Sequence, residues 1–117
     1  MMDKPGINTA IPKRRYRLGE FSLVVLGEID SADGIDYGYI LAAVREGEAE
    51  PGLYITAQSD PQQPTQNSLS MRVIMRDGSE VIGMSNRWGD LELFTSDALD
   101  IVIKILDLAD EQPFRLL

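Results

Sequence analysis

Residues 71–85 have the sequence MRVIMRDGSEVIGMS. Two runs rich in β-forming residues flank Asp77-Gly78, and Asp-Gly is a favoured pair in two-residue hairpin turns. Such a turn pairs Val73 with Ile82 and thereby decides which side chains share a face of the hairpin. If the pairing of the two strands slips by two residues, each side chain stays on the same face. The predicted buried face consists of Met71, Val73, Met75, Ile82 and Met84, and the opposite face of Arg72, Ile74, Arg76, Val81 and Gly83.

Three earlier segments have the composition of β-strands, namely Tyr16–Ile29, Tyr37–Glu46 and Leu53–Gln58. In the first, the apolar alternation slips by one position across Gly19-Glu20, which predicts either a bulge in one strand or a turn between two. Pro and Gly in residues 47–52 predict a turn after the second segment. The hydrophilic segment Asp60–Ser68 is expected to be a surface loop.

A long helix is expected at the C-terminal end of the chain. Thr95 or Ser96 can cap its first turn, and Pro113 prevents much continuation beyond Glu111. The apolar residues of this segment, Leu99 and Ile103 among them, cover a wider arc than a helix needs to lie on one sheet. Strands followed by a helix predict an α+β fold, an antiparallel meander of about five strands with one long helix packed on it.

The chain of 117 residues is expected to form a single α+β domain over residues 13–117, preceded by a flexible N-terminal tail over residues 1–12. The segments Leu23–Leu26 and Ile40–Val44 are apolar at both odd and even positions, which is typical of strands buried on both faces. One helix covers one face of a sheet. We therefore expect a second copy of the chain to cover the other face or the helix flank, and so a homodimer.

The composition excludes much chemistry, because the chain has no histidine, no cysteine and a net charge of -8. Most acid–base, nucleophilic and transition-metal sites use one of these two side chains, so we expect no catalysis, no metal and no cofactor. An acidic body also disfavours nucleic acid and anionic membranes as partners. No apolar leader or long apolar run is visible, which favours a soluble, cytoplasmic protein.

Basic residues concentrate near the start of the chain. Residues 1–20 hold five basic side chains against two acidic ones, a net of +3, so residues 21–117 carry the remaining -11. The cluster Lys13-Arg14-Arg15-Tyr16-Arg17 is interpreted as a strand edge guarded by charge. An anion contact, or attraction to the acidic surface of the same or another chain, is the alternative.

Four carboxylates, Glu28, Asp30, Asp33 and Asp36, surround the loop after the first strand segment. Oxygen ligands of this kind suit Ca²⁺ or Mg²⁺, but an EF-hand counted from Asp30 would need glycine at Ile35 and glutamate at Leu41. We therefore interpret the group as a solvated acidic loop. Paired carboxylates can also run glycosidase-type chemistry, yet acids in apparent loops give no sign of a buried pair.

Arg87 and Trp88 lie in an apparent loop before the helix, and Trp88 is the only tryptophan. Tryptophan and arginine are enriched at the centres of protein interfaces. The preferred interpretation is structural: Trp88 closes one end of the core, and Arg87 pairs with a nearby carboxylate. The alternative is an interaction site made of Arg87, Trp88, Leu99 and Ile103.

Three functions remain after these exclusions. The leading hypothesis is a non-catalytic protein–protein interaction module that forms a homodimer, with a basic protein as a further partner. The second is a small-molecule-binding module with an apolar pocket between sheet and helix, lined by Met71, Met75, Met84 and Tyr39. The third is a carboxylate-dependent enzyme. The sequence does not decide the partner, because no motif in it identifies a ligand.

Overall fold

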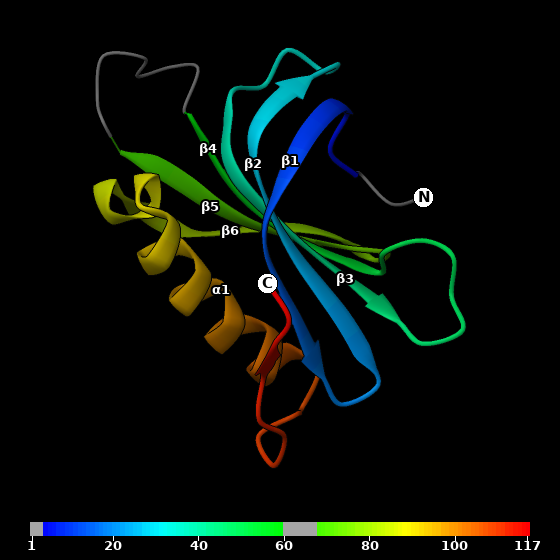
Figure 1. The fold of residues 1–117 in the computed structure, drawn as a ribbon. Helices are drawn as coiled ribbons and strands as arrows, with labels where there is room; N and C mark the ends of the chain where they lie inside the picture. Colours follow the sequence, from blue (N-terminus) through cyan, green and yellow to red (C-terminus); the bar gives the residue numbers. More distant parts are fainter. Residues whose placement is uncertain (1–3, 60–67) are drawn as a thin grey trace.

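The computed structural model describes residues 4–59 and 68–117, which form one antiparallel sheet with one α-helix packed on it (Figure 1). The strands are β1 (Ile7–Leu18), β2 (Phe21–Ser31), β3 (Tyr37–Arg45), β4 (Leu53–Ser59), β5 (Leu69–Met75), β6 (Gly78–Ser85) and β7 (Phe114–Arg115). Their order in the sheet is β6-β5-β4-β3-β2-β1-β7. The α+β class is confirmed, with more strands than the five predicted.

The additional strands have simple causes. Gly19-Glu20 is a turn and not a bulge: Leu18 pairs with Phe21 across it, and Gly19 adopts a left-handed φ of 58°. The predicted tail is wrong for residues 7–12, which belong to β1 because the long strand β2 supplies their partners out to Ser31. The predicted loop Asp60–Ser68 lies, apart from Ser68, outside the described residues.

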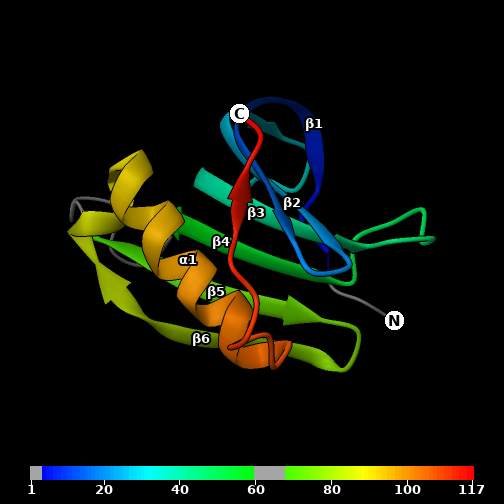
Figure 2. The ribbon, with the colours of Figure 1, turned by 60° about the horizontal axis from the view of Figure 1, so that its bottom comes forward.

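The first core lies between the sheet and α1 (Leu91–Ile105). Figure 2 shows this helix crossing one face of the sheet, with β6 along the rim below it. Phe94, Ala98 and Val102 recur at helical spacing, are fully buried, and pack on residues of the strands. The ring of Phe94 stacks on that of Tyr39 at a centroid distance of 5.6 Å. These contacts hold the helix in place over the sheet.

The helix begins four residues earlier than predicted, because Asp90 caps it. The Asp90 carboxylate accepts a hydrogen bond from the Leu93 amide at 3.0 Å, whereas Thr95 is buried inside the helix. The helix also ends six residues before Glu111. Asp107 takes a left-handed φ of 54°, and the Leu108 amide bonds back to the Ile103 carbonyl at 2.9 Å. Apolar periodicity continues through Leu108 although the helix does not.

The second face of the sheet carries its own core, in which Tyr37, Ile40, Ala42, Tyr54 and Ile74 are buried. The expectation that these strands are buried on both sides is therefore confirmed for β3. The cover comes from the chain itself. β2 leaves β3 after Leu26 and continues beside β1 alone, so that Ile7, Ile29 and Ile35 pack on this cluster. A second copy is thus not required to cover this face.

Candidate functional site

The outer edge of β6 is the least covered part of the sheet. No strand of the described residues pairs with that edge, and β6 is exposed along most of its length. Val81, Ile82 and Met84 retain 48%, 49% and 47% of their accessible surface. An exposed edge strand offers unpaired N–H and C=O groups to another chain, and apolar side chains there strengthen that tendency.

The predicted hairpin exists, but its register differs from the prediction. Met75 pairs with Gly78, so that Arg76 and Asp77 form the turn, and a bulge follows between Arg72–Val81 and Met71–Gly83. Ile82 is the extra residue of this bulge. Val73 is buried as predicted, whereas Ile82 and Met84 are half exposed and Ile74 is buried in the second core. The inserted residue turns Met84 to the face opposite Val73, whereas Ile82 stays on the face of Val73 and is half exposed because β6 is the edge strand.

The bulge also determines which side chains of β6 face the helix. Glu80 pairs with Val73 and Gly83 with Met71, both of which belong to the core under α1. Val81 pairs with Arg72 and therefore lies on the opposite face. Ile82 lines the space toward the helix together with Val73. The edge consequently presents apolar side chains on both faces.

A groove of about 630 Å³ runs between β6 and the C-terminal half of α1. Its apolar surface comes from Val73, Met75, Ile82, Ile101 and Ile105. Asp77, Glu80 and Lys104 supply charge around it. A groove of this kind beside an open strand can receive a side chain of any segment that pairs with the strand.

Arg87 and Trp88 take the structural roles that the sequence analysis preferred. Trp88 is buried in the first core, and its indole Nε1 donates to Asp97 Oδ2 at 2.8 Å. The guanidinium of Arg87 pairs with the same carboxylate, at 2.8 Å from Nε to Oδ2. The 3-10 helix Asn86–Gly89 is thereby tied to α1, at the end of β6 away from its hairpin turn. Their proposed interface role stays a prediction.

The other predicted site residues do not converge on one cavity. Leu99 and Ile103 are half-buried against the first core. Met71 is fully buried, Met75 lines the groove, Met84 is exposed on β6, and Tyr39 stacks on Phe94. The groove residues Ile101, Lys104 and Ile105 were missed. A usable signal existed, because the last strand of a meander has one neighbour and leaves its outer edge to the following helix or to solvent.

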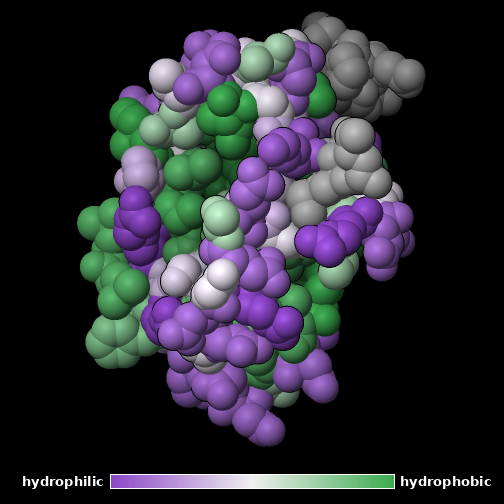
Figure 3. Space-filling model, turned by 90° about the vertical axis from the view of Figure 1, so that its right-hand side faces the viewer, coloured by the Kyte–Doolittle hydropathy of each residue, from purple (hydrophilic) through white to green (hydrophobic). Residues whose placement is uncertain are grey.

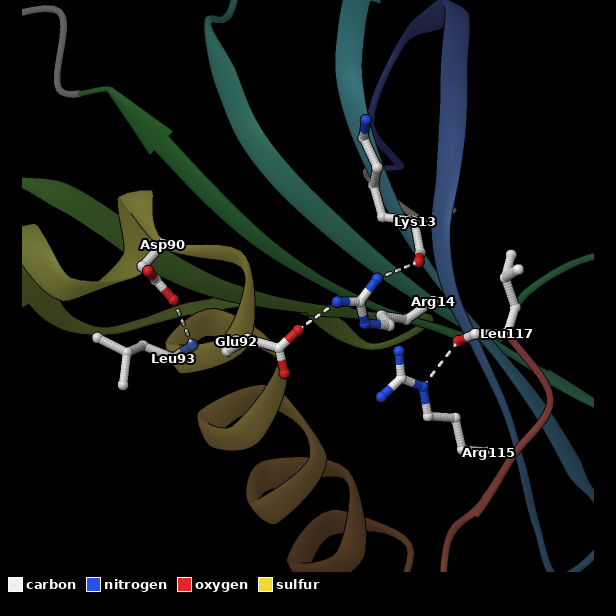
Figure 4. Close-up of polar contacts among 7 residues, drawn as sticks. All are labelled: Lys13, Arg14, Asp90, Glu92, Leu93, Arg115 and Leu117. Atoms are coloured by element: carbon white, nitrogen blue, oxygen red, sulfur yellow. Dashed lines mark hydrogen bonds and ion pairs between the residues drawn. The ribbon is translucent and has the colours of Figure 1, made fainter.

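The basic segment of β1 is paired with carboxylates of its own chain, and Figure 4 shows one of these pairs, Arg14 with Glu92. Arg14 forms an ion pair with Glu92 of α1, Lys13 with Glu28, and Arg17 with Glu46 at 3.0 Å. The C-terminal segment runs along the same edge, where the Leu116 amide donates to the Arg15 carbonyl at 2.7 Å. This arrangement agrees with the predicted charged edge and with the alternative of attraction to the protein's own acids.

The acidic loop uses a carboxylate to hold backbone in place. Asp33 accepts hydrogen bonds from the Gly6 amide at 2.8 Å, the Tyr37 hydroxyl at 2.7 Å and the Ile35 amide at 3.0 Å. Burial raises the pKa of Asp33, but these hydrogen bonds outweigh it, so its pKa lies below the ordinary value. Within residues 4–59 and 68–117, no three acidic groups lie close enough to hold a metal ion.

Apolar side chains reach the surface elsewhere too. Figure 3 shows hydrophobic surface beside hydrophilic surface on the side of the molecule that it faces. Phe114, Leu116 and Leu117 of the C-terminal segment are exposed by 67%, 61% and 51%. These residues, however, belong to a segment whose backbone already pairs with β1. β7 is the last strand at this end of the sheet, but it has only two residues, against eight in β6.

The comparisons with known proteins identify no relative: no family model, no curated protein and no solved structure matches this chain. In the part of the chain that the structure describes, no helix has the length and apolar character needed to cross a bilayer. Function is therefore inferred from the residues of the site.

Proposed function

We propose that the protein is a non-catalytic protein–protein interaction module, homodimeric as the sequence suggests, whose β6 edge receives an extended segment of another chain. One observation carries the proposal: among residues 4–59 and 68–117, no strand pairs with the outer side of β6, and its apolar side chains are exposed on both faces. Strand addition of this kind derives affinity from main-chain hydrogen bonds and specificity from side-chain pockets. The groove beside β6 supplies such a pocket.

Catalysis is left out of the proposal for chemical reasons. The chain has neither histidine nor cysteine. Of the carboxylates in contact with the basic cluster, Glu28, Glu46 and Glu92 are all engaged in ion pairs. Asp33, the carboxylate with a perturbed pKa, is held by three donors, and its pKa moves away from the range that suits a general acid near neutral pH.

Selection of peptides from a random display library tests strand addition directly. We expect selected peptides to carry alternating apolar residues, to compete with one another, and to bind Val81→Lys at least tenfold more weakly than the native protein. Ile11→Lys is the matched control, because Ile11 of β1 has the same exposure of 48%. Peptides that bind both variants equally well, or no selected peptides at a protein concentration where the chain is monomeric, would contradict the proposal.

Binding of a small molecule in the groove is the second candidate. The groove volume of about 630 Å³ falls within the range of ligand pockets, and its apolar lining is accompanied by the charged residues Asp77, Glu80 and Lys104. A fragment screen by NMR separates the two functions. Fragments that shift Ile101 and Ile105 in a protein that selects no peptide would favour the small molecule.

A further inference from the structure

We infer that the segment received by β6 is β6 of a second copy, paired antiparallel about a two-fold axis that passes beside Val81. This inference rests on the proposed function, because it names the partner of the same edge. It replaces the dimer contacts expected from the sequence, since the chain itself covers the second face of the sheet. The resulting assembly would join two sheets into one through their β6 strands.

Charge favours a second copy over a basic partner at this surface. The protein as a whole carries -8, but the hairpin Leu69–Ser85 carries two basic residues, Arg72 and Arg76, against two acidic ones, Asp77 and Glu80. Its net charge is zero, and Lys104 of the groove adds one positive charge. A basic partner would be attracted to an acidic surface, whereas two like-charged copies meet best where each is neutral. Screening at physiological salt weakens the remaining repulsion beyond about 8 Å.

The alternation of faces restricts the register. Residues directly opposite each other in an antiparallel pair lie on the same face of the sheet. Consecutive residues of one strand lie on opposite faces, so they cannot be paired with each other across the axis. The two-fold axis must therefore pass beside a single residue, which then pairs with its own copy. An axis at Glu80 would place two carboxylates opposite each other, which is destabilising. An axis at Val81 places the two valines together on the face away from α1, where each is half exposed.

The Val81 register also gives the groove an occupant. It places Ile82 of one copy opposite Glu80 of the other, on the face that α1 covers. Ile82 then lies at the mouth of the partner's groove, which Ile101 and Ile105 line. The bulge at Ile82 keeps the strand pairing short, and the apolar contact at the two grooves extends the interface beyond it.

Cysteine cross-linking tests the register, because the native chain has no cysteine to interfere. In the proposed dimer the two Val81 Cα atoms are about 4.5–5.5 Å apart, within the range of a disulfide, whereas the two Ser79 Cα atoms are separated by about 14 Å along the strands. Val81→Cys, Ser79→Cys and Ile11→Cys are equilibrated in a glutathione redox buffer, which takes up the two electrons released. Circular dichroism verifies that each exposed substitution leaves the fold intact.

The expected result is a dimer of the native protein in sedimentation at tens of micromolar and at least tenfold more disulfide dimer for Val81→Cys than for either control. A native protein that is monomeric, or Ser79→Cys and Val81→Cys that cross-link equally, would overturn the inference. A monomer whose selected peptides still bind at β6 would overturn this inference alone. Loss of peptide binding as well would overturn the proposed function.

Discussion

β6 and β1 lie near the two ends of the sheet, with the short strand β7 outside β1, and they are protected to very different degrees. The stretch of β1 from Pro12 to Arg17 contains a proline that lacks an N–H and four basic residues, and β7 pairs with its end. β6 contains no basic residue and no proline, and no described strand pairs with its outer side. Natural sheets block their edges with charge, proline or covering segments. β1 uses all three.

This difference identifies the outer side of β6 as the place where we expect the protein to accept another chain. β6 carries one charged residue, Glu80, and a bulge at Ile82, and the Ile82 side chain lies toward the groove and is half exposed. We expect this contrast to respond to substitutions that add charge to β6 or loosen the segment that covers β1.

The largest effect is expected from Phe94→Ala, which removes the anchor of the helix that forms one wall of the groove. Phe94 is fully buried, and truncation of such a side chain costs about 3–5 kcal/mol of the free energy of unfolding. Urea unfolding measures it. Leu93→Ala is the control, since Leu93 is 40% exposed and should change stability by less than about 1 kcal/mol. Equal losses for the two variants would show that Phe94 does not anchor the helix.

The next effect is the loss of self-association in Val81→Lys. A lysine on an edge strand opposes pairing with another chain, and we expect a dimer dissociation constant at least tenfold higher, or about 1.4 kcal/mol. Folding stability should change by less than about 0.5 kcal/mol, because Val81 is half exposed. Sedimentation equilibrium gives the constant. An Ile11→Lys variant that dissociates as readily as Val81→Lys would remove the contrast between the edges.

Opening the protected edge should have a smaller effect. Leu116→Pro removes the amide that donates to the Arg15 carbonyl at 2.7 Å, and the expected loss is about 1 kcal/mol of the free energy of unfolding. Leu116→Ala keeps the amide and truncates a side chain that is 61% exposed, so it should be nearly neutral. Urea unfolding of both variants makes the comparison. If proline were as neutral as alanine, the C-terminal segment would contribute nothing to this edge.

The smallest effect is expected in the pH dependence of stability when Asp33 is replaced. Because the pKa of Asp33 is lowered in the folded protein from its ordinary value of 3.8, its ionised form stabilises the fold above that value. The contribution decreases as the pH falls through the lower, folded pKa. Asp33→Asn should therefore reduce stability near neutral pH and flatten its decline below about pH 4. Thermal melts across this range measure both. Parallel curves for the two proteins would exclude the role of Asp33.

Much of the fold follows from local patterns. The turns after Leu18 and Arg45, the hairpin near Asp77 and the single C-terminal helix were all predictable from glycine, proline and apolar periodicity. The helix ends were not. At the start, Leu91 and Leu93 have no pattern that separates them from a loop unless Asp90 is taken as the cap. At the end, Leu106 and Leu108 continue the apolar pattern beyond the last helical residue, Ile105.

The site was less predictable, and for a physical reason. A bulge leaves no mark in the composition of a strand, so the face on which Met84 lies could not be derived from alternation alone. The cover of the second face depends on β2 leaving β3 and continuing with β1. Long-range packing determines this path of β2. Apolar residues at both odd and even positions show that both faces of a strand are covered, but the cover can come from a partner chain or from another segment of the same chain.

Hydrogen–deuterium exchange at two protein concentrations tests the central claim, that β6 is open and β1 is closed. At low micromolar concentration, the β6 amides that face away from β5 should exchange quickly, while amides near Arg15–Arg17 that bond to β2 or to the C-terminal segment should be protected. At hundreds of micromolar, protection should rise in β6 and stay unchanged in β1. Protection that rises with concentration in β1, or in neither strand, would contradict the account.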